Sequence, residues 1–487
     1  MNVLHISKSD FSGGASIASL RLHQCLNNCN LEINSEMRVI RQITNDKKII
    51  SKNNIFHQKI FPKYLTLINK IYRSSFKTKN RVIHSTALFK TGLGEELTKK
   101  KYFKKFDIFH LHWLGDSTIS IKEIGLFKKP IVWTLHDQWP FCGAEHYTYP
   151  NIEKVNELID RRYFSSYSSE SRLGIDRGID INRYTWLKKK KYWQNKFHII
   201  CPSKWMSECA HKSSLFKNNP IYTIPNPIDT ELWKPISRNE SRTFLDISLS
   251  KKIILFGALN INDQRKGAKL LFEALKILLQ VIPNDLMKKI EIVVFGKDQH
   301  KNKFDIKLPI KFVGKIRDVN KLSMIYSSAD VFVNPSIQES FGQTASEAHS
   351  CGTPVVAFDS GGLKDIVTHL ETGYLAIPFD TRSLANGIKW VLENDIRRIL
   401  AYSIVNQVGF MLVGIGIGTH LSINGAITHA FAHIIYKAFL LMSAGSVIYM
   451  TQKRRCTDVG GLYRTMPITT ICGIIGALAI SSFPLTS

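Results

Sequence analysis

Residues 334–356 read NPSIQESFGQTASEAHSCGTPVV, and this stretch combines strand, loop and helix signals with two carboxylates. The apolar run before it ends at Pro335, Glu339 falls in a polar loop, and a helix is expected to begin near Phe341. Glu339 and Glu347 stand eight residues apart, a spacing that on a helix gives about 12 Å of rise and nearly the same face. Two surface glutamates on an ordinary helix are the alternative interpretation.

The backbone around Phe341 and Gly342 predicts an anion site. If the helix begins there, the N–H groups of these two residues have no partner inside the helix, and the helix dipole favours a negative ligand beside them. The loop and helix together predict a cradle for three groups. A sugar would lie beside Glu339, a diphosphate on the two amides, and a ribose beside Glu347.

The chain around this stretch alternates short apolar runs with amphipathic segments, which predicts an α/β fold. The apolar runs are nearly continuous, as expected of parallel strands that are covered on both faces. Almost 400 residues of this pattern exceed one doubly wound sheet and indicate two Rossmann-like halves. Three prolines within residues 224–235 mark the boundary between them. The expected strands are Asn2–Ser7, Phe106–Leu114, Pro130–His136, Phe197–Ser203, Ile253–Leu259, Ile290–Phe295, Ala329–Pro335 and Pro354–Phe358, and the expected helices include Leu270–Leu279 and Phe341–Cys351.

Residues 334–356 resemble the C-terminal half of the GT-B-fold glycosyltransferases of family 4, in which a Glu-x7-Glu motif precedes a Cys-Gly-Thr-Pro-Val-Val strand. The resemblance continues through SGGLKD, residues 360–365, and ETGY, residues 371–374, and covers about residues 1–394. It implies two Rossmann-like domains that face each other across a cleft, an acceptor-side domain over 1–225 and a nucleotide-sugar-binding domain over 226–394. It also implies that Glu339 contacts the donor sugar and Glu347 the nucleoside ribose.

A second motif, residues 257–267, reads GALNINDQRKG and follows the first strand of the second half. Two adjacent cations before a glycine, Arg265 and Lys266, suit a diphosphate whose charge increases as the leaving group departs. The family commonly places an arginine where this chain has Ala258, so Arg265 is expected to compensate. A solvated helix start is the alternative interpretation of the two cations.

In the first half, Gly13 and Gly14 follow the first strand within Ser-Gly-Gly-Ala-Ser, residues 12–16. Glycines at this place let the backbone approach a phosphate or sugar without a Cβ in the way, although Gly-Gly also serves simple turns. By the family resemblance, this loop lies against the pyrophosphate of the donor.

His136 ends an apolar strand, at the edge where open α/β sheets bind ligands. It adjoins Asp137 and matches a Leu-His-Asp/Asn element of the family, which implies a hydrogen bond from His136 to the transferred sugar or its developing charge. Asp137 is a candidate for positioning the acceptor. His110 and His112 alternate along another strand and are interpreted as structural or cleft-lining residues.

These residues predict an enzyme that moves a glycosyl group from a nucleotide-diphospho-sugar to a hydroxyl of a saccharide or lipid-linked saccharide, in surface polysaccharide or glycolipid biosynthesis. The resemblance implies retention of anomeric configuration. No cofactor and no catalytic metal are expected: the sequence contains no Asp-x-Asp, and helix-end amides with Arg265 and Lys266 would supply the electrostatic stabilisation.

The chain carries 66 basic and 39 acidic side chains, a net charge of +27, which suggests an anionic partner. Zinc-finger spacing, aromatic RNP pairs and KH-type loops are absent from the sequence, so nucleic acid is not expected. Residues 151–195 are interpreted as a polar insertion with mobile parts. Its basic run, residues 188–191, is interpreted as a solvated face rather than a nucleic-acid-binding site.

The last part of the chain, residues 395–487, has a different composition. Only eight charged side chains follow Ile396, seven of them positive, and three stretches are long and apolar enough to predict transmembrane helices. Both basic segments flanking the first two spans would lie on the cytoplasmic side by the positive-inside rule. The catalytic body would then lie in the cytoplasm at the inner face of the cell membrane. The expected spans are 399–419, 421–450 and 468–485.

Within the second expected span, His429, His433 and Lys437 recur every four residues and would share one helix face. This tail resembles the proton-conducting antiporter-like subunits of respiratory complex I and Mrp-type antiporters, which implies that the three residues belong to a proton pathway. A helix buried in a soluble core is the alternative. The sequence therefore predicts a chimera of a glycosyltransferase and an antiporter fragment. An ion-translocating subunit with an accessory domain, or a GT-B sugar-nucleotide epimerase, are the competing functions.

Overall fold

The computed structural model describes the two sheets of the chain, the helices around them and part of the tail. The described residues are 1–29, 31–51, 84–88, 93–115, 118–148, 161–172, 177–297, 306–393 and 462–480, with short pieces at 64, 67, 76–77, 91, 440, 442–447 and 450.

The first of two compact units contains residues 1–229 together with Ser336–Gln343 and Asp359–Ile366. Its sheet has seven parallel strands in the order β3-β2-β1-β5-β6-β8-β9. Most residues of β1, β2, β5 and β6 are buried, as predicted for a sheet covered on both faces, although β1 and β2 also contain polar side chains. The strands are β1 Asn2–Ser9, β2 Asn34–Arg41, β3 Ile49–Ile50, β5 Ile108–Leu111, β6 Ile131–Thr134, β8 His198–Cys201 and β9 Ile221–Thr223, and a separate pair is formed by β4 Phe76–Lys77 and β7 Arg177–Gly178.

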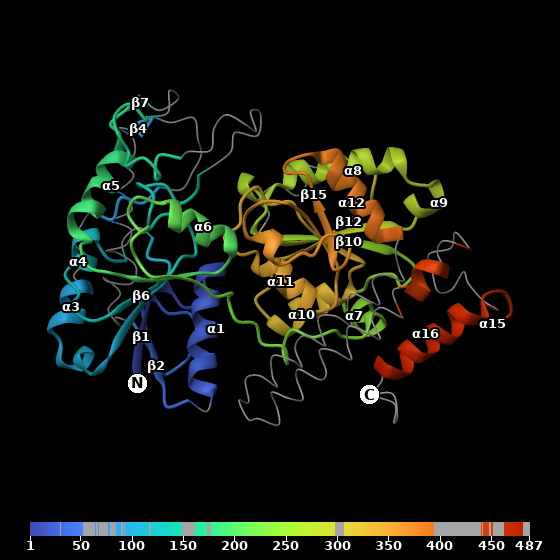
Figure 1. Ribbon diagram of the computed structural model, residues 1–487, viewed down its shortest axis with the longest axis horizontal. Coiled ribbons are helices and arrows are strands. Elements are labelled where there is room, and N and C mark those ends of the chain that lie inside the picture. The colour runs from blue at the N-terminus through green and yellow to red at the C-terminus, as the bar shows by residue number, and fades with distance from the viewer. Residues whose placement is uncertain are drawn as a thin grey trace. The chain divides into compact units, whose positions relative to one another are not determined.

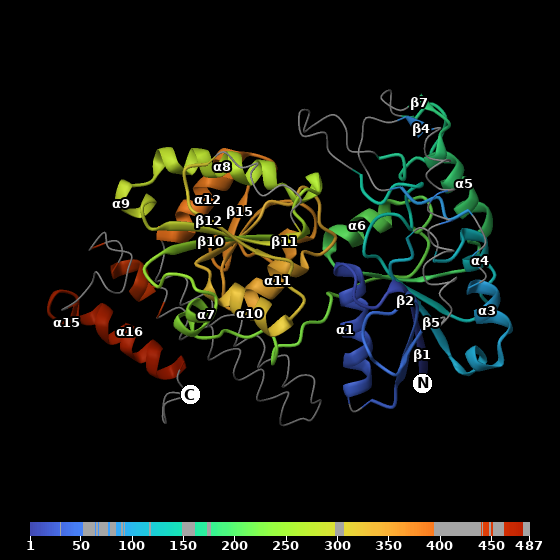
Figure 2. The same ribbon diagram turned by 180° about the vertical axis from the view of Figure 1, so that it is seen from behind.

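Helices cover both faces of this sheet. Helix α1 lies on one face, and α3, α4 and α5 lie on the other (Figures 1 and 2). The aromatic core of the unit is built around Trp133, which makes ring contacts with Trp139, Trp193, Phe197 and Phe216. The helices are α1 Gly14–Asn28, α3 Leu93–Lys99, η2 Lys101–Lys105, α4 Ile121–Gly125, α5 Ile181–Tyr192, α6 Lys204–Lys212 and η4 Gly361–Asp365.

The second unit contains a six-stranded parallel sheet in the order β12-β11-β10-β13-β14-β15. Helices α8 and α12 lie on one face of this sheet, and α10 and α11 lie on the other (Figures 1 and 2). The strands are β10 Lys252–Asn260, β11 Ile290–Lys297, β12 Ile310–Gly314, β13 Val331–Asn334, β14 Val355–Phe358 and β15 Gly373–Ala376. The helices are α7 Arg238–Phe244, η3 Gln264–Lys266, α8 Ala268–Val281, α9 Asn284–Met287, α10 Val319–Ser328, α11 Gln343–Ser350 and α12 Thr381–Glu393.

A buried ion pair fixes α7 to the second sheet. Asp330 is 2% exposed and accepts hydrogen bonds from Arg242 Nη2 at 2.7 Å and from the backbone N–H of Ile253 at 2.7 Å. The Arg242 guanidinium, 1% exposed, also donates to four backbone carbonyls. The carboxylate therefore balances a charge that has no access to water.

All eight predicted strands are present, within a few residues of the expected ends. The interpretation of residues 188–191 as a solvated run is wrong for Lys189, which is fully buried on α5. Its Nζ donates to the carbonyls of Trp139, Cys142 and Gly143 and lies over the Trp139 ring. Burial lowers the pKa of Lys189 to about 7. A basic run on a helix thus supplies one side chain that fixes the loop after β6.

The tail is described at α15 Leu462–Thr465, α16 Pro467–Ile480 and a few residues before them. Helix α16 overlaps the third expected span from residue 468 to residue 480. None of the helices that the structure describes is long and apolar enough to cross a membrane. The expected span 399–419 and nearly all of 421–450 lie outside the described residues.

We expect the Asp330→Asn variant to destabilise the second unit by about 3 kcal/mol, because it leaves the Arg242 charge buried without its counter-ion. Hydrogen exchange of the β10 amides, measured by mass spectrometry on the full chain, reports this change. The exposed Asp285→Asn variant is the matched control, with an expected effect below about 0.5 kcal/mol. Equal protection of β10 in both variants would contradict this account of Asp330.

Candidate active site

The loop that carries Glu339, Ser336–Gln343, belongs to the first unit although it follows a strand of the second sheet. Glu339 is half-buried, and its Oε1 accepts a hydrogen bond from Ser336 Oγ at 2.9 Å. Gln338 Nε2 donates to Gln138 Oε1 at 2.7 Å, and Ser203 Oγ donates to the Ser340 carbonyl at 2.7 Å. Polar side chains from the loops after β6 and β8 therefore hold the Glu339 loop.

Two glycines of η4 fit directly against the backbone of the Glu339 loop. The N–H of Gly362 donates to the Glu339 carbonyl at 2.8 Å. A Cβ on Gly361 would overlap that carbonyl oxygen, and a Cβ on Gly362 would come within 2.6 Å of the Ser340 carbonyl oxygen. Gly361 also has a φ of 58°, a conformation that favours glycine. The Ser-Gly-Gly element thus permits a backbone contact that any side chain would block.

The helix after the loop begins later than predicted. Helix α11 starts at Gln343 rather than near Phe341, because Gly342 has a φ of 102° and interrupts the helical path. Phe341 and Gly342 therefore precede the helix, and Glu339 lies outside it. The expectation of eight helical steps from Glu339 to Glu347 does not apply.

Gly13 and Gly14 lie at the start of α1, within the same unit as the Glu339 loop. Gly13 has a φ of 92° and its carbonyl accepts the first helical hydrogen bond, from Ile17 at 3.1 Å. With its amide oriented to satisfy both groups, Gln343 donates to the Gly14 carbonyl at 3.0 Å and accepts from Arg21. The predicted glycine loop and the residue next to Gly342 are thus joined by a hydrogen bond.

His136 follows β6 and is half-buried in the first unit. Its Nε2 shares a hydrogen bond of 3.0 Å with Nδ1 of His112. Asp137, by contrast, is 3% exposed and accepts from Trp113 Nε1 at 2.6 Å, from the backbone N–H of Trp139 at 3.1 Å and from His146. Burial raises the pKa of Asp137, but the His146 interaction and these donors outweigh burial and hold it below its usual value. The Asp137 carboxylate is thus engaged by its own chain.

Buried histidines lie behind His136. His5, His110 and His112 each offer one nitrogen within 4.8 Å of the others, a set of residue types that can ligate a divalent transition metal. In the structure, Nδ1 of His5 and Nε2 of His112 instead lie 2.9 Å apart in a hydrogen bond. Burial lowers the pKa of His110 to about 3 and that of His136 to about 4, and it lowers the pKa of His5 and His112 well below the usual value.

Arg265 and Lys266 form η3 in the second unit. Arg265 pairs with Asp263, Nη2 to Oδ2 at 3.2 Å, and its side chain is 12% exposed. Gly267 follows with a φ of 68°, and a Cβ there would overlap the Pro335 carbonyl oxygen. The turn with both cations therefore packs against the carboxyl end of β13. The interpretation as a freely solvated helix start does not fit the nearly buried Arg265.

Glu347 lies on α11 in the second unit and is 5% exposed. Its Oε2 accepts a hydrogen bond from the Tyr326 hydroxyl at 3.2 Å. The alternative of a surface glutamate is therefore wrong for Glu347. A carboxylate has acceptor positions for several hydrogen bonds, so the burial of Glu347 is compatible with contacts to hydroxyl groups of a ligand.

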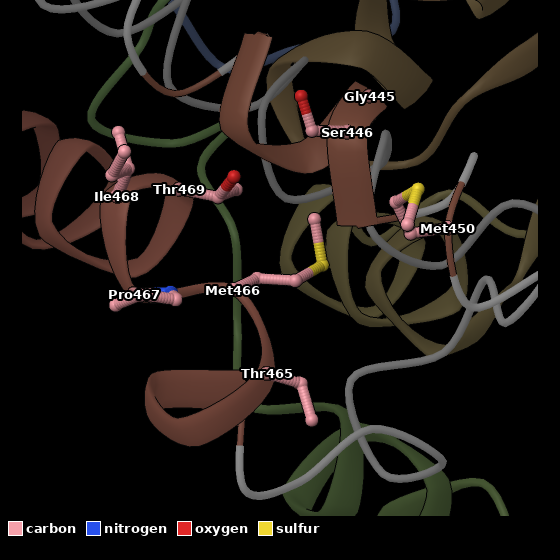
Figure 3. A pocket seen from close by; sticks show the side chains of 8 residues that line it. All are labelled: Gly445, Ser446, Met450, Thr465, Met466, Pro467, Ile468 and Thr469. Atoms are coloured by element: carbon pink, nitrogen blue, oxygen red, sulfur yellow. The ribbon is translucent and has the colours of Figure 1, made fainter.

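The predicted tail residues His429, His433 and Lys437 lie outside the described residues. The described tail has a hollow between the segment at 445–450 and the start of α16 (Figure 3), and none of the predicted site residues lines it. Its lining residues are Gly445, Ser446, Met450, Thr465, Met466, Pro467, Ile468 and Thr469.

Sequence reasoning missed the residues that hold the Glu339 loop, namely Gln138, Ser203 and Asp365. Ser203 caps α6 by accepting from the Met206 N–H, and Asp365 accepts from the Lys204 N–H. Ser203 stands where a strand gives way to a helix, which is a recognisable capping signal. Its second hydrogen bond, to Ser340, joins residues 137 positions apart and leaves no local signal.

Comparisons with known families cover both parts of the chain. Residues 56–232 match the model described as Glycosyltransferase Family 4, and residues 237–403 match the model described as Glycosyl transferases group 1. Residues 384–487 match the transmembrane model of NADH:quinone oxidoreductase and Mrp antiporters. Both resemblances drawn from the sequence are confirmed, and the interpretation as a chimera fits.

Curated relatives of respiratory-complex type match the C-terminal part of the chain. NADH-ubiquinone oxidoreductase chain 5 of Dictyostelium citrinum is 40% identical over 98 residues, which are 20% of this chain and 14% of the relative. F(420)H(2) dehydrogenase subunit L of Methanosarcina mazei is 35% identical over 104 residues, 21% of this chain and 16% of the relative. The chain thus spans only a small part of the length of these relatives.

Solved structures match the body. WaaG, a glycosyltransferase involved in lipopolysaccharide biosynthesis, aligns with a TM-score of 0.51 and 14% identity over 82% of this chain and 93% of that chain. Anabaena HepE, solved in complex with UDP-glucose, aligns with a TM-score of 0.50 and 15% identity over 84% of this chain and 95% of that chain. With the two parallel sheets, these neighbours establish an α/β fold of two domains like that of GT-B glycosyltransferases.

We expect Gly361→Ala to loosen the Glu339 loop, because the new methyl group meets the Glu339 carbonyl and the backbone keeps a positive φ. Protection of the Gly362 amide against hydrogen exchange should fall by about 2 kcal/mol or more. Gly314→Ala is the matched control: its φ of 73° is also positive, but nothing lies within 4 Å of the added Cβ. A control that loosens its own loop as much would show that backbone strain alone explains the effect.

The first unit should lose stability in acid. The buried histidines have folded-state pKa values below the unfolded value of about 6.5, so the unfolded chain binds more protons as the pH falls below 6.5. Above pH 6.5 the neutral histidines cost no stability. Below pH 6.5, each lowers the free energy of unfolding by about 1.4 kcal/mol per pH unit, and for His110 this loss continues down to its folded-state pKa of about 3. Urea unfolding followed by tryptophan fluorescence at several pH values measures the slope.

The control for this slope is a pair of variants. His110→Gln should lower the number of protons taken up on unfolding by about one, which makes the pH dependence of the free energy of unfolding less steep. His198→Gln, at an exposed position, should leave this pH dependence unchanged. Stability that stays constant from pH 6.5 to 5 would contradict the assignment of neutral buried histidines.

Proposed function

We propose that this chain, whose residues 56–403 are those of a glycosyltransferase, moves a sugar from a nucleotide-diphospho-sugar to a hydroxyl of a saccharide or lipid-linked saccharide, with retention of anomeric configuration. The observation that carries the proposal is the Glu339 loop. Its backbone is fixed by Gly361 and Gly362, and it shares a compact unit with Gly13, Gly14 and His136. Anabaena HepE was solved with UDP-glucose bound, which makes uridine diphosphate sugars the first donors to test.

In this proposal, Glu339 accepts hydrogen bonds from hydroxyls of the transferred sugar. An ionised carboxylate has two oxygens with several acceptor positions, and one of these on Glu339 Oε1 is used by the Ser336 hydroxyl. Backbone N–H groups near Gly14 and Gly342 bind the diphosphate. Gly13 and Gly342 have positive φ values and no Cβ, so the diphosphate can approach the backbone closely there. His136 and Asp137 belong to the same unit. We assign the contact with the transferred sugar to His136 and the positioning of the acceptor to Asp137.

The second unit would bind the rest of the donor. Glu347 would accept from the ribose hydroxyls, and Arg265 and Lys266 would neutralise the charge on the departing diphosphate. These two cations are our reason for proposing that the reaction uses no metal and no cofactor. A nearly buried guanidinium has a fixed position, so little reorganisation is required when charge develops.

For the tail, we propose a membrane-spanning fragment that places the transferase at the cytoplasmic face of the membrane. The family match over residues 384–487 supports a membrane segment, and seven of the eight charges after Ile396 are positive. The match covers 14–16% of the relatives, so proton translocation through His429, His433 and Lys437 is the weaker candidate.

The Glu339→Gln variant should lower kcat/KM for a uridine diphosphate sugar about a hundredfold, because a hydrogen bond to a carboxylate is worth up to about 3 kcal/mol. Glu347→Gln should mainly raise the KM for the donor, because the ribose contact is the same in ground and transition states. Release of nucleoside diphosphate measures both, and NMR of the product compares its anomeric configuration with that of the donor. Glu240→Gln, at an exposed position of α7, is the control.

Three outcomes would contradict the proposal. Equal activity of the Glu339→Gln and Glu240→Gln variants would remove Glu339 from the site. An inverted product would overturn retention. An epimerised sugar nucleotide formed without any acceptor would establish the epimerase instead.

A further inference from the structure

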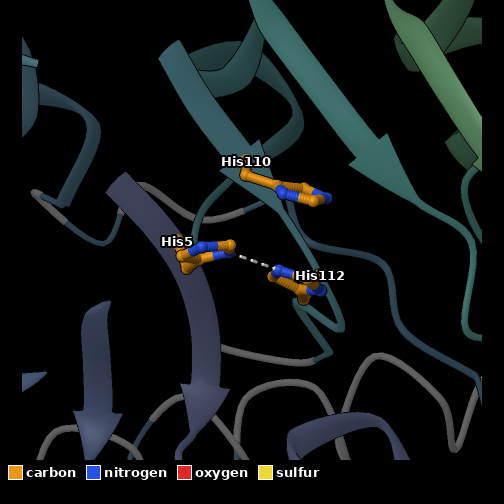
Figure 4. Close-up of side chains that lie close together, drawn as sticks. All are labelled: His5, His110 and His112. Carbon is orange, nitrogen blue, oxygen red and sulfur yellow. Dashed lines mark hydrogen bonds between the residues drawn. The ribbon is translucent and has the colours of Figure 1, made fainter. Parts of the chain in front are cut away.

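One face of the first sheet carries a row of buried polar side chains. His5 on β1 lies directly opposite His110 on β5 in the strand register, and His112 follows two residues later on the same face. Figure 4 shows the His5 and His112 rings side by side and joined by a hydrogen bond, with the His110 ring above them. Burying imidazoles is costly unless they are hydrogen-bonded, so the hydrogen bonds of these three side chains have to be accounted for.

The hydrogen bonds continue from the core to the half-buried His136. Nδ1 of His5 lies 2.9 Å from Nε2 of His112, and Nδ1 of His112 lies 3.0 Å from Nε2 of His136. The rings of His112 and His136 are also stacked, with centroids 5.3 Å apart. The three side chains form a chain, His5–His112–His136, that runs outward from the sheet interior.

A neutral imidazole has one N–H and one acceptor nitrogen, so the protons of this chain have only two consistent orientations. All three histidines are neutral near pH 7, because burial holds each pKa well below that value. In one orientation every N–H points outward, and Nδ1 of His136 carries a proton. In the other orientation every N–H points inward, and Nδ1 of His136 is a bare lone pair.

The inner end of the hydrogen-bonded chain, at His5, decides between the outward and inward orientations. Nε2 of His5 is fully buried and has no hydrogen-bond partner within the described part of the structure. The inward orientation would leave an orphaned N–H there, whereas the outward orientation leaves an acceptor. Buried N–H groups without a partner are rarer than under-satisfied acceptors, so the outward orientation is favoured.

We propose that His5 and His112 are positioning residues whose hydrogen-bonded chain holds His136 as the tautomer with its proton on Nδ1. His136 then donates a hydrogen bond from Nδ1 to an oxygen of the bound sugar nucleotide. A nitrogen that already carries a proton cannot accept another from the acceptor hydroxyl, so His136 serves as a donor and not as a general base. This inference rests on the proposed function for the contact with substrate, but the tautomer itself does not depend on it.

The test is nitrogen-15 NMR of the full chain labelled at histidine, which distinguishes a protonated Nδ1 from a protonated Nε2. The His136 signals are assigned by their loss in a His136→Asn variant. We expect protonation at Nδ1 in the unmodified protein without any substrate. Protonation of His136 at Nε2 overturns the proposal, whether or not the protein transfers sugar.

A pair of variants at position 112 tests the chain itself. Asn places an amide N–H near the position of Nδ1 and should keep the tautomer of His136, whereas Phe removes the donor and should let the proton move to Nε2. His112→Phe should lower kcat about tenfold with a smaller change in the KM for the donor, the effect of one neutral hydrogen bond, and His112→Asn should restore most of it. His198→Gln, at an exposed position, is the control.

Failure of the two proposals can be told apart. An unmodified protein with the expected tautomer but no sugar transfer would refute the proposed function and leave the histidine chain intact. If His136 has the same tautomer in the His112→Phe and His112→Asn variants, the hydrogen-bonded chain does not set that tautomer, and the inference is refuted even if sugar transfer is normal. If His112→Phe does not fold, the spectrum of the unmodified protein still decides the orientation.

Discussion

The backbone of the loop after β14 packs directly on the backbone of the loop after β13, and the rest of the candidate site depends on this contact. Gly362 donates to the Glu339 carbonyl at 2.8 Å, and Gly361 leaves no room for a Cβ beside the same oxygen. A hydrogen bond between main chains fixes the path of the loop independently of side-chain rotamers. The Ser336 hydroxyl then helps to orient the Glu339 carboxylate.

This contact also explains how a parallel sheet produces a site. Adjacent parallel strands end at one edge, so the loops after β13 and β14 emerge side by side, and the turn at Gly267 packs against Pro335 at the same edge. In the first unit, the corresponding edge carries Gly13 after β1 and His136 after β6. Four glycines of these loops have positive φ values, namely Gly13, Gly267, Gly342 and Gly361. Backbone conformation, rather than apolar packing, determines where the functional groups lie.

The strands can be predicted because each is a short apolar run, whereas elements built with charges cannot. Strand β2 contains Glu36 and Arg38, which are buried by pairing with Lys105 and Glu96, and no local pattern reveals partners so far along the chain. The burial of Lys189 escapes sequence reasoning for the same reason. The start of α11 differs from the prediction because Gly342 has a φ of 102°. Glycine permits this conformation, but the presence of a glycine in the sequence does not show that it is adopted. The site residues themselves can be named from motifs, but the hydrogen bonds that hold them join positions 137 and 200 residues apart.

The junction of the two parts can be argued from burial. The transferase match ends at residue 403 and the antiporter match begins at 384, so both include residues 384–393 of α12. On α12, Leu384, Ile388 and Leu392 are buried, and Leu392 is the last buried apolar residue of the described chain. The described apolar side chains of α16, by contrast, are exposed: Ile468 is 79% exposed and Ile471 is 56% exposed. The helix shared by both matches therefore completes the core of the second unit, which closes without the described residues of the tail. Among the described residues, the apolar core of the second unit therefore ends on α12, and the exposed apolar side chains of α16 are not part of it.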